Sequence, residues 1–360
     1  MKILIVIPNN SRGGAEQFLR MIASNYKSEE VSVYMFKKLN LPFKEVLETD
    51  FEVHYLSSNS ELIGIFKFML TMLFKKTNFD YTYTSHVKTN AIVGFLRTLH
   101  VIKSKYVVAR ESTSIFLRFK GKKLAFYKLL YAIGYNKIDL LICQTDLMKQ
   151  QFEKYNPRIS SKTKIKVIPN PIRLPNKENR LLNNKPLLNN DPFMVAAGRL
   201  IPIKGFDILI NAFAQIKKET PNLKLVLLGD GLEKQNLKQL AQQLNIEKDV
   251  IFAGFIENIY DYFSQAKLCV VSSLMEGFPN VLLQMMSQNN KIVSTLCAGG
   301  IETIPGIFTC NPNNIEALTT ALSKCLKKDT STNTEVFKQF ISNRTVDAFI
   351  TTLNKELNAI

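Results

Sequence analysis

Short apolar runs alternate with longer amphipathic stretches along the chain. In the first half these runs are rich in β-branched residues and predict strands at 3–8, 31–36, 51–56, 80–85, 105–110, 139–144 and 165–170. Between most of them, apolar residues recur with the period of a helix, as in Glu16 to Tyr26. This alternation predicts a parallel sheet covered by helices.

A change of composition interrupts the alternation. Residues 171–192 contain four prolines and six asparagines, which favours a linker. Strands are then predicted at 193–198, 223–229, 249–254, 267–273, 291–296 and 306–310, and helices at 206–219 and 232–244. The last amphipathic stretch, Glu335 to Leu357, is also predicted to be helical.

The predicted domain organisation follows from this division. We expect an N-terminal domain at 1–172, a linker at 173–192 and a C-terminal domain at 193–339, with the helix at about 340–360 packing back on the N-terminal domain. Each domain should be α/β, Rossmann-like and doubly wound, and the two should face each other across a cleft. Because open parallel sheets bind ligands beyond the carboxyl ends of their strands, functional residues are expected in the loops after the strands.

Positive charge is concentrated in the first half of the chain. The formal net charge is +17, and residues 1–180 contain 30 Lys and Arg against 14 Asp and Glu. Such a half attracts an anionic partner: nucleic acid, an anionic membrane or a phosphorylated substrate. A lysine-rich proteome would explain the total, but it explains the asymmetry poorly.

Cysteine usage and apolar run lengths indicate a cytoplasmic protein. The five cysteines include no C-x-x-C pair, which favours reduced thiols. The first apolar run is too short for a signal peptide, and the longest one, Leu62 to Phe74, contains Lys67 and is too short to span a bilayer. We expect a soluble or peripheral protein.

Two loops of the C-terminal domain carry candidate phosphate-binding residues. Gly198 closes a strand, and Arg199 and Lys204 follow it before a helix. A planar guanidinium and a compact ammonium can converge there on a diphosphate, although two basic residues on a loop are as easily merely solvated. Gly229 and Asp230 also lie between a strand and a helix, where glycine lets the backbone approach an anion or simply makes a tight turn.

A third loop follows the strand at 267–273 and begins with Glu276. It continues with Gly277, Phe278, Pro279, Asn280 and Val281. A helix is predicted from about Val281, so backbone N–H groups and a positive helix end are available to a phosphate. Glu276 and Gln284 are eight residues apart, which is two helical turns, so both are expected to face the same side and bond hydroxyl groups.

Taken together, GR…KG at 198–205, GDG at 229–231 and S-x-x-E-G-F-P-N-V-L-L at 273–283 resemble the retaining glycosyltransferases of family 4, which have the two-domain GT-B fold. The resemblance is strong over about 194–304. It extends to Gly13-Gly14-Ala15-Glu16, which is similar to the family's glycine-rich first loop, and is weak through 40–135.

The resemblance implies a role for each matching position. Arg199 and Lys204 would bind the diphosphate, and Glu276, the first acid of the family's E-x7-E motif, would contact the donor sugar; these are the expected catalytic residues. The other donor-binding positions that it implies are Gly13, Gly14, Gly198, Gly229, Asp230, Phe255, Ile256, Gly277, Phe278, Pro279, Asn280, Val281 and Gln284.

One position departs from the family's pattern. The second acid of the motif, which holds the ribose hydroxyls, is here Gln284, and an amide forms hydrogen bonds without the assistance of a charge. We therefore expect weaker donor binding.

No metal and no other cofactor is expected. The sequence contains no D-x-D and only three histidines. Arg199, Lys204 and helix N-termini would then meet the charge of the leaving group. The family implies retention of configuration, and because no nucleophile is evident, attack on the same face is favoured, with the departing phosphate accepting the proton.

The acceptor is expected on the basic N-terminal domain. His86, Arg110 and Glu111 follow predicted strands and are candidates for positioning the acceptor hydroxyl, with Ser112 and Thr113 beside them. A single histidine at a strand end is, however, more often structural. Segments 62–76 and 116–137 combine apolar, aromatic and basic residues, which is typical of helices that lie on anionic lipid, or of core helices with a lysine-rich rim.

We expect a retaining, metal-independent glycosyltransferase of the hexosyltransferase class, using a nucleotide-diphosphate sugar, with UDP the expected nucleotide. Its acceptor would be a glycan or a lipid-linked glycan in bacterial surface polysaccharide biosynthesis, such as lipopolysaccharide or capsule. It is expected in the cytoplasm, peripheral on the inner face of the membrane.

The alternatives are a sugar-nucleotide epimerase, a basic protein that binds nucleic acid or anionic surfaces without catalysis, and a family member inactivated by Gln284. The scarcity of histidines counts against the epimerase, and the lack of a recognised module counts against nucleic acid binding.

Overall fold

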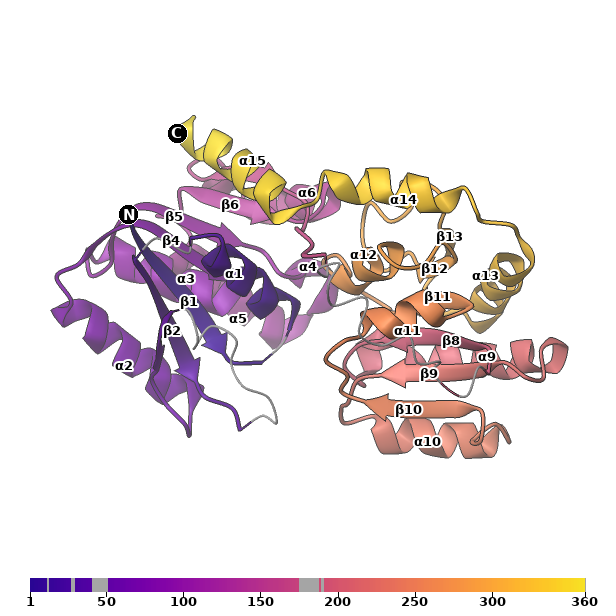
Figure 1. Cartoon of the computed structure of the whole chain (residues 1–360). Helices are drawn as coiled ribbons and strands as arrows, with labels where there is room; N and C mark the ends of the chain where they lie inside the picture. Colours follow the sequence, from indigo (N-terminus) through magenta and orange to yellow (C-terminus); the bar gives the residue numbers. More distant parts are fainter. Residues whose placement is uncertain (12, 27–29, 41–50, 175–187, 189–190, 360) are drawn as a thin grey trace. The chain divides into compact units, whose positions relative to one another are not determined.

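The computed structural model describes residues 1–11, 13–26, 30–40, 51–174, 188 and 191–359. The chain forms two compact units, one of Met1–Pro171 with Val346–Ile360 and one of Ile172–Thr345 (Figure 1). In sequence, the second unit is inserted between the two parts of the first. Most of the expected linker at 173–192 lies outside the described residues.

The first unit is built on a seven-stranded parallel sheet. Its strands are β1 (Lys2–Asn9), β2 (Glu30–Lys37), β3 (Glu52–Tyr55), β4 (Asn78–Ser85), β5 (Lys103–Arg110), β6 (Leu140–Cys143) and β7 (Lys164–Val167). Their order in the sheet is β3-β2-β1-β4-β5-β6-β7, so the direction of winding reverses between β1 and β4. This is the doubly wound order of a Rossmann-like domain.

Helices cover both faces of this sheet (Figure 1). They are α1 (Gly14–Ser24), α2 (Glu61–Phe74), α3 (Val87–Thr98), α4 (Ile115–Arg118), α5 (Gly121–Gly134), α6 (Asp146–Tyr155), α7 (Pro157–Ser160) and α15 (Val346–Asn358). Alternate residues of β1 enter different cores: Ile3 and Ile5 pack with α1 and α15, and Leu4 and Val6 pack with α2, α3 and α5. Burial on both faces explains why the strands are nearly continuous apolar runs.

The second unit repeats this plan with a six-stranded parallel sheet. Its strands are β8 (Phe193–Ala197), β9 (Lys224–Leu228), β10 (Val250–Gly254), β11 (Leu268–Val271), β12 (Ile292–Thr295) and β13 (Phe308–Cys310). The order is β10-β9-β8-β11-β12-β13, so here the reversal falls between β8 and β11.

Helices again lie on both faces of the second sheet (Figure 1). They are the 3-10 helix η3 (Pro202–Lys204), α9 (Phe206–Glu219), α10 (Lys234–Gln243), α11 (Tyr260–Gln265), α12 (Asn280–Met286), α13 (Ile315–Lys327) and α14 (Asn333–Ser342). Residues of α9 and α13 pack on one face with Met194 and Ala196 of β8, and residues of α12 and α14 pack on the other with Phe193 and Val195. The predicted fold class, two doubly wound α/β sheets, is confirmed.

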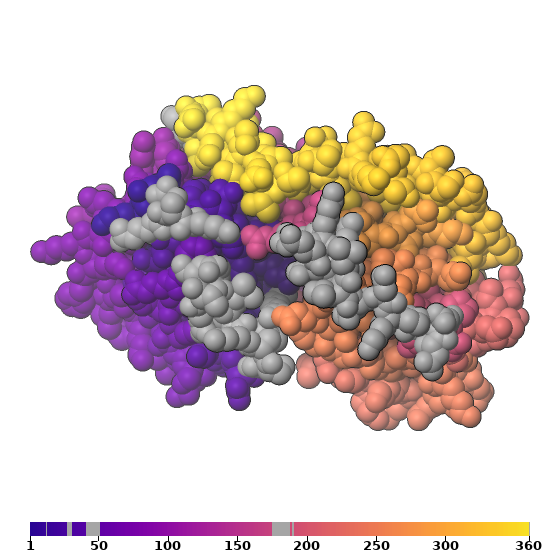
Figure 2. Space-filling view, in the orientation of Figure 1, coloured from indigo at the N-terminus to yellow at the C-terminus, as the bar shows by residue number. Residues whose placement is uncertain are grey.

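The C-terminal stretch differs from the expectation of one helix from Glu335 to Leu357. It is two helices, α14 and α15, separated at residues 343–345. There the carbonyl oxygen of Arg344 accepts a hydrogen bond from Ile172 N at 2.7 Å, and Thr345 forms a β-bridge with Ile172. This pairing ends the helix. Beyond it, α15 lies on the surface of the first unit (Figure 2, yellow), with the Phe349 ring 5.3 Å from that of Phe18.

Candidate functional site

The reversal point of the second sheet brings two candidate loops together. Arg199 and Lys204 follow β8, Glu276 follows β11, and β8 and β11 are neighbours in the sheet. Lys204 Nζ forms an ion pair with Glu276 Oε1, and Ser273 Oγ donates to the same oxygen at 2.9 Å. The Lys204 and Glu276 side chains are 18% and 19% exposed. Arg199 is exposed. Lys204 and Glu276, which are 72 positions apart in the sequence, thus meet beside Arg199. They lie at the reversal of the strand order, which is where open sheets bind ligands.

The loop that carries Lys204 is fixed by its backbone. Ser272 Oγ donates to the carbonyl oxygen of Lys204 at 2.9 Å, and Leu274 N donates to that of Ile203 at 2.8 Å. Gly205 adopts φ +60°, and a Cβ atom there would lie 2.3 Å from the carbonyl oxygen of Ser272. Only glycine satisfies both conditions, so the sequence KG places the ammonium against the loop of Glu276.

Gly229 and Asp230 lie on the adjoining loop, after β9. A Cβ atom on Gly229 would meet the carbonyl oxygen of Gly198 at 2.0 Å, so these two expected donor-binding glycines are in direct backbone contact. Asp230 is exposed, and its carboxylate accepts from Lys234 Nζ at 3.0 Å and Gly231 N at 2.8 Å. These hydrogen bonds lower the pKa of Asp230, so it stays ionised.

The turn from Gly277 to Val281 joins Glu276 to α12. Gly277, Phe278 and Pro279 are buried, and the Phe278 ring lies 5.2 Å from the Arg344 guanidinium. The Phe278 side chain therefore belongs to the core, which leaves the backbone of this turn as the part able to meet a donor. Asn280 and Val281 are partly exposed.

The expected helical relationship between Glu276 and Gln284 is wrong. α12 begins at Asn280 with Pro279 as its N-cap, so Glu276 precedes the helix and the two side chains do not lie on one helical face. Gln284 Nε2 instead donates to Tyr260 OH of α11 at 3.3 Å, and Tyr260 OH donates to the carbonyl oxygen of Arg173 at 3.1 Å.

The candidate base-bordering residues follow β10. Gly254 adopts φ +72° with open space around its Cα, Phe255 is 48% exposed, and Ile256 is partly buried. The Phe255 ring is thus partly exposed to solvent directly after a left-handed glycine.

In the first unit, candidate residues gather where that sheet reverses. Gly13 and Gly14 follow β1, and His86 follows β4, which is the neighbour of β1. Glu16 joins them: its Oε1 lies 3.1 Å from His86 Nε2, and His86 Nδ1 lies 3.2 Å from Ser112 Oγ. The sequence did not single out Glu16, because an acid in the first turn of a helix is common for electrostatic reasons alone.

Arg110 and Glu111 are buried, each 2% exposed, which counts against the expectation that they position the acceptor hydroxyl. Arg110 donates to Asn170 Oδ1 at 2.5 Å and packs 4.5 Å from the Phe18 ring. Burial lowers the pKa of Arg110 to about 9. Both side chains bond to neighbouring elements inside the first unit, and neither is exposed to a substrate.

Glu111 is held by two tyrosines of α5 that the sequence did not single out. Tyr131 OH donates to Glu111 Oε2 at 3.0 Å, and Tyr135 OH donates to Oε1 at 2.7 Å. Burial raises the pKa of Glu111 to about 7, although these bonds act in the opposite direction.

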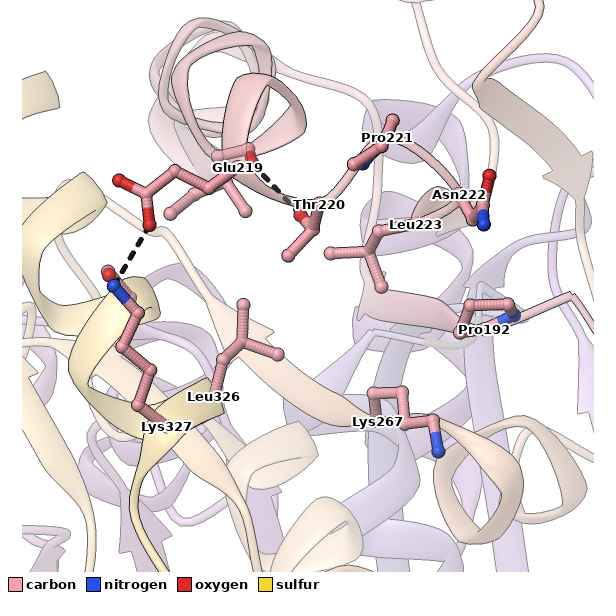
Figure 3. Close-up of a pocket in the computed structure, with 11 residues that line it drawn as sticks. Pro192, Glu219, Thr220, Pro221, Asn222, Leu223, Lys267, Leu326 and Lys327 are labelled. Atoms are coloured by element: carbon pink, nitrogen blue, oxygen red, sulfur yellow. Dashed lines mark hydrogen bonds and ion pairs between the residues drawn. The ribbon is translucent and has the colours of Figure 1, made fainter.

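Two cavities lie at the amino-terminal ends of the strands, away from these residues. One, of about 390 Å³ in the second unit, is lined by residues that include Pro192, Leu223 and Lys267, and the Lys327–Glu219 ion pair of 2.9 Å lies at its margin (Figure 3). The other, of about 610 Å³ in the first unit, has several basic lining residues, among them Arg97 and Lys137. Within the described residues, His, Cys, Asp and Glu form no cluster able to hold a metal ion.

Comparison with known proteins points to one family for the second unit. Residues 178–343 match the model of the family described as glycosyl transferases group 1. An uncharacterized glycosyltransferase of Methanocaldococcus jannaschii is 28% identical over 294 residues, which are 78% of this chain and 65% of that protein.

A second relative has a named activity. The N-acetylgalactosamine-N,N'-diacetylbacillosaminyl-diphospho-undecaprenol 4-alpha-N-acetylgalactosaminyltransferase of Campylobacter jejuni is 28% identical over 307 residues, 82% of this chain and 80% of that enzyme. Among solved structures, that of Anabaena HepE in complex with UDP and glucose has a TM-score of 0.82 at 22% identity, covering 100% of both chains. Residues 178–343 therefore match the glycosyl transferases group 1, and the chain has the GT-B fold.

Proposed function

We propose that this chain is a retaining, metal-independent glycosyltransferase that moves a sugar from a UDP-linked donor to a glycan or lipid-linked acceptor in bacterial surface polysaccharide biosynthesis. The observation that carries the proposal is the Lys204–Glu276 ion pair beside the exposed Arg199 at the reversal of the second sheet. Two similar proteins support the substrate classes. The Campylobacter relative acts on a diphospho-undecaprenol glycan, which supports a lipid-linked acceptor, and the HepE structure holds UDP and glucose, which supports a UDP-linked donor.

The proposed donor site separates two tasks. The guanidinium of Arg199 and the ammonium of Lys204 bind the diphosphate, the first as a fork and the second as a point charge. Lys204 has three N–H donors, so it can keep its bond to Glu276 while it binds a phosphate oxygen. Glu276, held by Lys204 and Ser273, then presents its other carboxylate oxygen to the hydroxyl groups of the donor sugar.

The proposed reaction is a displacement on one face of the sugar. The bond between the anomeric carbon and the phosphate oxygen breaks, and the acceptor oxygen bonds to the same face of that carbon. The acceptor's proton passes to the departing phosphate oxygen. Negative charge grows on the diphosphate, so cations already in place lower the barrier without having to reorganise.

The test is to remove the cations one at a time. Arg199→Ala and Lys204→Ala should each reduce transfer at least ~100-fold, with circular dichroism and melting temperature showing that the fold is retained. Lys218→Ala removes an exposed cation of α9 and is the charge-matched control. Full transfer by either site variant would refute the assignment. Nucleotide release that is equal with and without acceptor would refute transfer itself.

The proposed location, peripheral on an anionic membrane, rests on the first unit. No helix in the described part of the chain has the length and apolarity of a membrane span. Nevertheless, Leu62, Phe66 and Phe74 of α2 are 76%, 60% and 78% exposed, while Phe68 and Met72 on the other side of that helix are buried in the core. An amphipathic core helix would instead present polar residues to water.

Helix α5 packs on the same face of the sheet as α2, and it also exposes large apolar side chains. Its Phe126, Leu129 and Ile133 are about half exposed. Lys122 and Lys123 lie in its first turn, where the helix dipole disfavours cations, so helix stability does not account for them. Apolar side chains bordered by lysines match an anionic lipid surface, where each lysine contributes about 1 kcal/mol.

Vesicle flotation tests this location. The protein should float with phosphatidylglycerol vesicles at low salt, less well at high salt, and not with phosphatidylcholine vesicles. The double variant Leu62→Glu/Phe66→Glu should lose binding, whereas Leu232→Glu, which changes a 91% exposed leucine of the second unit, should keep it. Absence of flotation at low salt would refute the proposal.

A further inference from the structure

Glu16, His86 and Ser112 form a continuous hydrogen-bonded chain across the reversal of the first sheet. Glu16 Oε1 lies 3.1 Å from His86 Nε2, and Ser112 Oγ lies 3.2 Å from His86 Nδ1. The three residues come from the first turn of α1, the junction of β4 with α3, and the loop after β5. Both ring nitrogens of the histidine are thus engaged.

The chain leads from the interior to the surface. The Glu16 side chain is 7% exposed, that of His86 is 38% exposed, and Ser112 is partly exposed. An incoming molecule can reach both His86 and Ser112, but both ring nitrogens of His86 are engaged, so Ser112 keeps the free hydrogen-bonding capacity. The buried end is fixed by packing: a Cβ atom on Gly13 would lie 2.4 Å from Glu16 Oε2, so the glycine makes room for the carboxylate.

The histidine is held in an unusual backbone conformation. His86 has φ +86°, outside the regions that residues with a side chain ordinarily adopt, and it is the N-cap of α3 without a capping side-chain bond. Such strain persists only where surrounding contacts impose it, and it is concentrated at functional sites. Here the imposed conformation directs the ring at Glu16 and Ser112 together.

The direction of each hydrogen bond follows from the charge of Glu16. Burial raises the pKa of Glu16, but the hydrogen bond and charge of His86 outweigh this, and the net pKa is lowered. Glu16 is therefore an acceptor, and His86 Nε2 donates to it. While the imidazole is neutral, Nδ1 is an acceptor, so Ser112 donates its hydroxyl hydrogen inward and keeps both lone pairs free.

Protonation of His86 reverses the last bond. Nδ1 then carries a hydrogen and donates it to Ser112 Oγ. This bond occupies one lone pair of the serine oxygen, and the hydroxyl hydrogen points outward. Ser112 thus changes from a group that accepts hydrogen bonds to one that preferentially donates them.

We propose that this chain positions the acceptor substrate: Ser112 accepts a hydrogen bond from a sugar hydroxyl of the acceptor while His86 is neutral, and Glu16 holds the His86 ring in the orientation and tautomer that this requires. The inference rests on the proposed function and adds to it two positioning residues, Glu16 and His86, and one residue, Ser112, that contacts the acceptor.

Other charged groups also face this chain. Glu111 acts on His86 from the loop after β5, and Arg20 of α1 and Arg110 of β5 act on Glu16. Because the pKa of Glu111 is about 7, its titration overlaps the range in which histidines titrate. Each measurement therefore needs the Glu111→Gln variant as a control.

The first arm of the test does not depend on activity. The chain has only three histidines, so His86 can be assigned by NMR from the signal that is lost in His86→Gln. We expect Glu16→Ala to shift the ring 15N signals of His86 away from the tautomer that carries its hydrogen on Nε2, because the carboxylate that accepts from Nε2 is gone. Unchanged ring signals would overturn the role of Glu16.

The second arm measures the acceptor KM against pH. In the wild type it should rise as acidification protonates the histidine, and Glu16→Ala should raise it even at high pH, because the His86 ring is no longer held. Ser112→Ala should raise the acceptor KM roughly 3- to 10-fold and abolish the rise. Thr113→Ala, which removes the neighbouring hydroxyl, should keep the pH dependence. The donor KM serves as the internal reference.

A wild-type pH profile in Ser112→Ala would overturn the role of Ser112. Absence of transfer to any acceptor would refute the proposed function, and with it the acceptor contact. The NMR arm would still decide whether Glu16 controls His86, so the two failures are distinguishable.

Discussion

Tyr135 donates its hydroxyl hydrogen to Glu111 Oε1 at 2.7 Å within the core of the first unit. Glu111 is 2% exposed, and burial raises its pKa from the ordinary value of 4.5 to about 7. The two hydrogen bonds from tyrosines favour the charged form, yet they do not compensate for the loss of water around the carboxylate. The site therefore holds a proton that an unfolded chain would release.

This raised pKa predicts a stability change with pH. Because Glu111 binds its proton more tightly in the folded chain, its contribution is fully present below pH 4.5 and is lost as pH rises to about 7. Glu111→Gln stays neutral and should remove this loss. The difference in unfolding free energy between Glu111→Gln and wild type should shift in favour of the variant by about 3 kcal/mol as pH rises from 4.5 to 7. Urea denaturation at both pH values measures the difference; an equal difference at the two would contradict the assignment.

Replacing Lys204 by methionine should separate structure from catalysis. Methionine keeps most of the aliphatic volume, so the half-buried Glu276 loses its cation but not its packing. We expect a stability loss of about 1 kcal/mol and a fall in kcat of at least ~100-fold. Lys204→Arg should recover part of the activity because the charge returns. Thermal melts and steady-state kinetics give both values, and a methionine variant with wild-type kcat would exclude Lys204 from the site.

Gly205→Ala should disrupt the loop that carries Lys204. The alanine would need φ +60° and would place its Cβ 2.3 Å from the carbonyl oxygen of Ser272. We expect about 3 kcal/mol of destabilisation, together with lost transfer. Gly254→Ala, at φ +72° with nothing within 4 Å, isolates the backbone strain and should cost only about 1 kcal/mol. Equal melting temperatures for the two variants would show that the close approach to Ser272 is unimportant.

Gln284→Glu tests whether the amide weakens donor binding. A carboxylate would offer the ribose hydroxyls a charge-assisted bond, and Tyr260 OH, which now donates to Arg173, could donate to it instead. We expect the donor KM to fall roughly 3- to 10-fold with little change in kcat. Gln288→Glu, four residues further along the chain and beyond the end of α12, controls for the added charge. A higher donor KM in Gln284→Glu would mean that the amide is the better partner here.

The fold could be predicted because its pattern is local. Central strands such as β1, β6 and β11 are buried on both faces, so they are visible as apolar runs, and the helices between strands keep their own period. The order of strands in the sheets is not local. It is this order, with β8 beside β11, that brings Lys204 to Glu276, and the motif spacing indicated only that each follows a strand.

Each error has a specific structural cause. Arg110 and Glu111 follow a strand, as an exposed site residue would, but α5 returns Tyr131 and Tyr135 over Glu111, and no spacing shows this. The helical relationship between Glu276 and Gln284 ignored Pro279, which is typical of a helix start and here precedes α12. The break between α14 and α15 depends on pairing with Ile172, which lies far away in the sequence.

The insertion of the second unit into the first has a consequence for synthesis. Phe349, Leu353 and Leu357 of α15 belong to the core of the first unit, yet they leave the ribosome after the whole second unit. The second unit can therefore complete its own core first, while the unit made earliest keeps an open apolar face along α1 until α15 emerges. A nascent chain stalled before Val346 would carry that face uncovered, which makes it a natural target for chaperones.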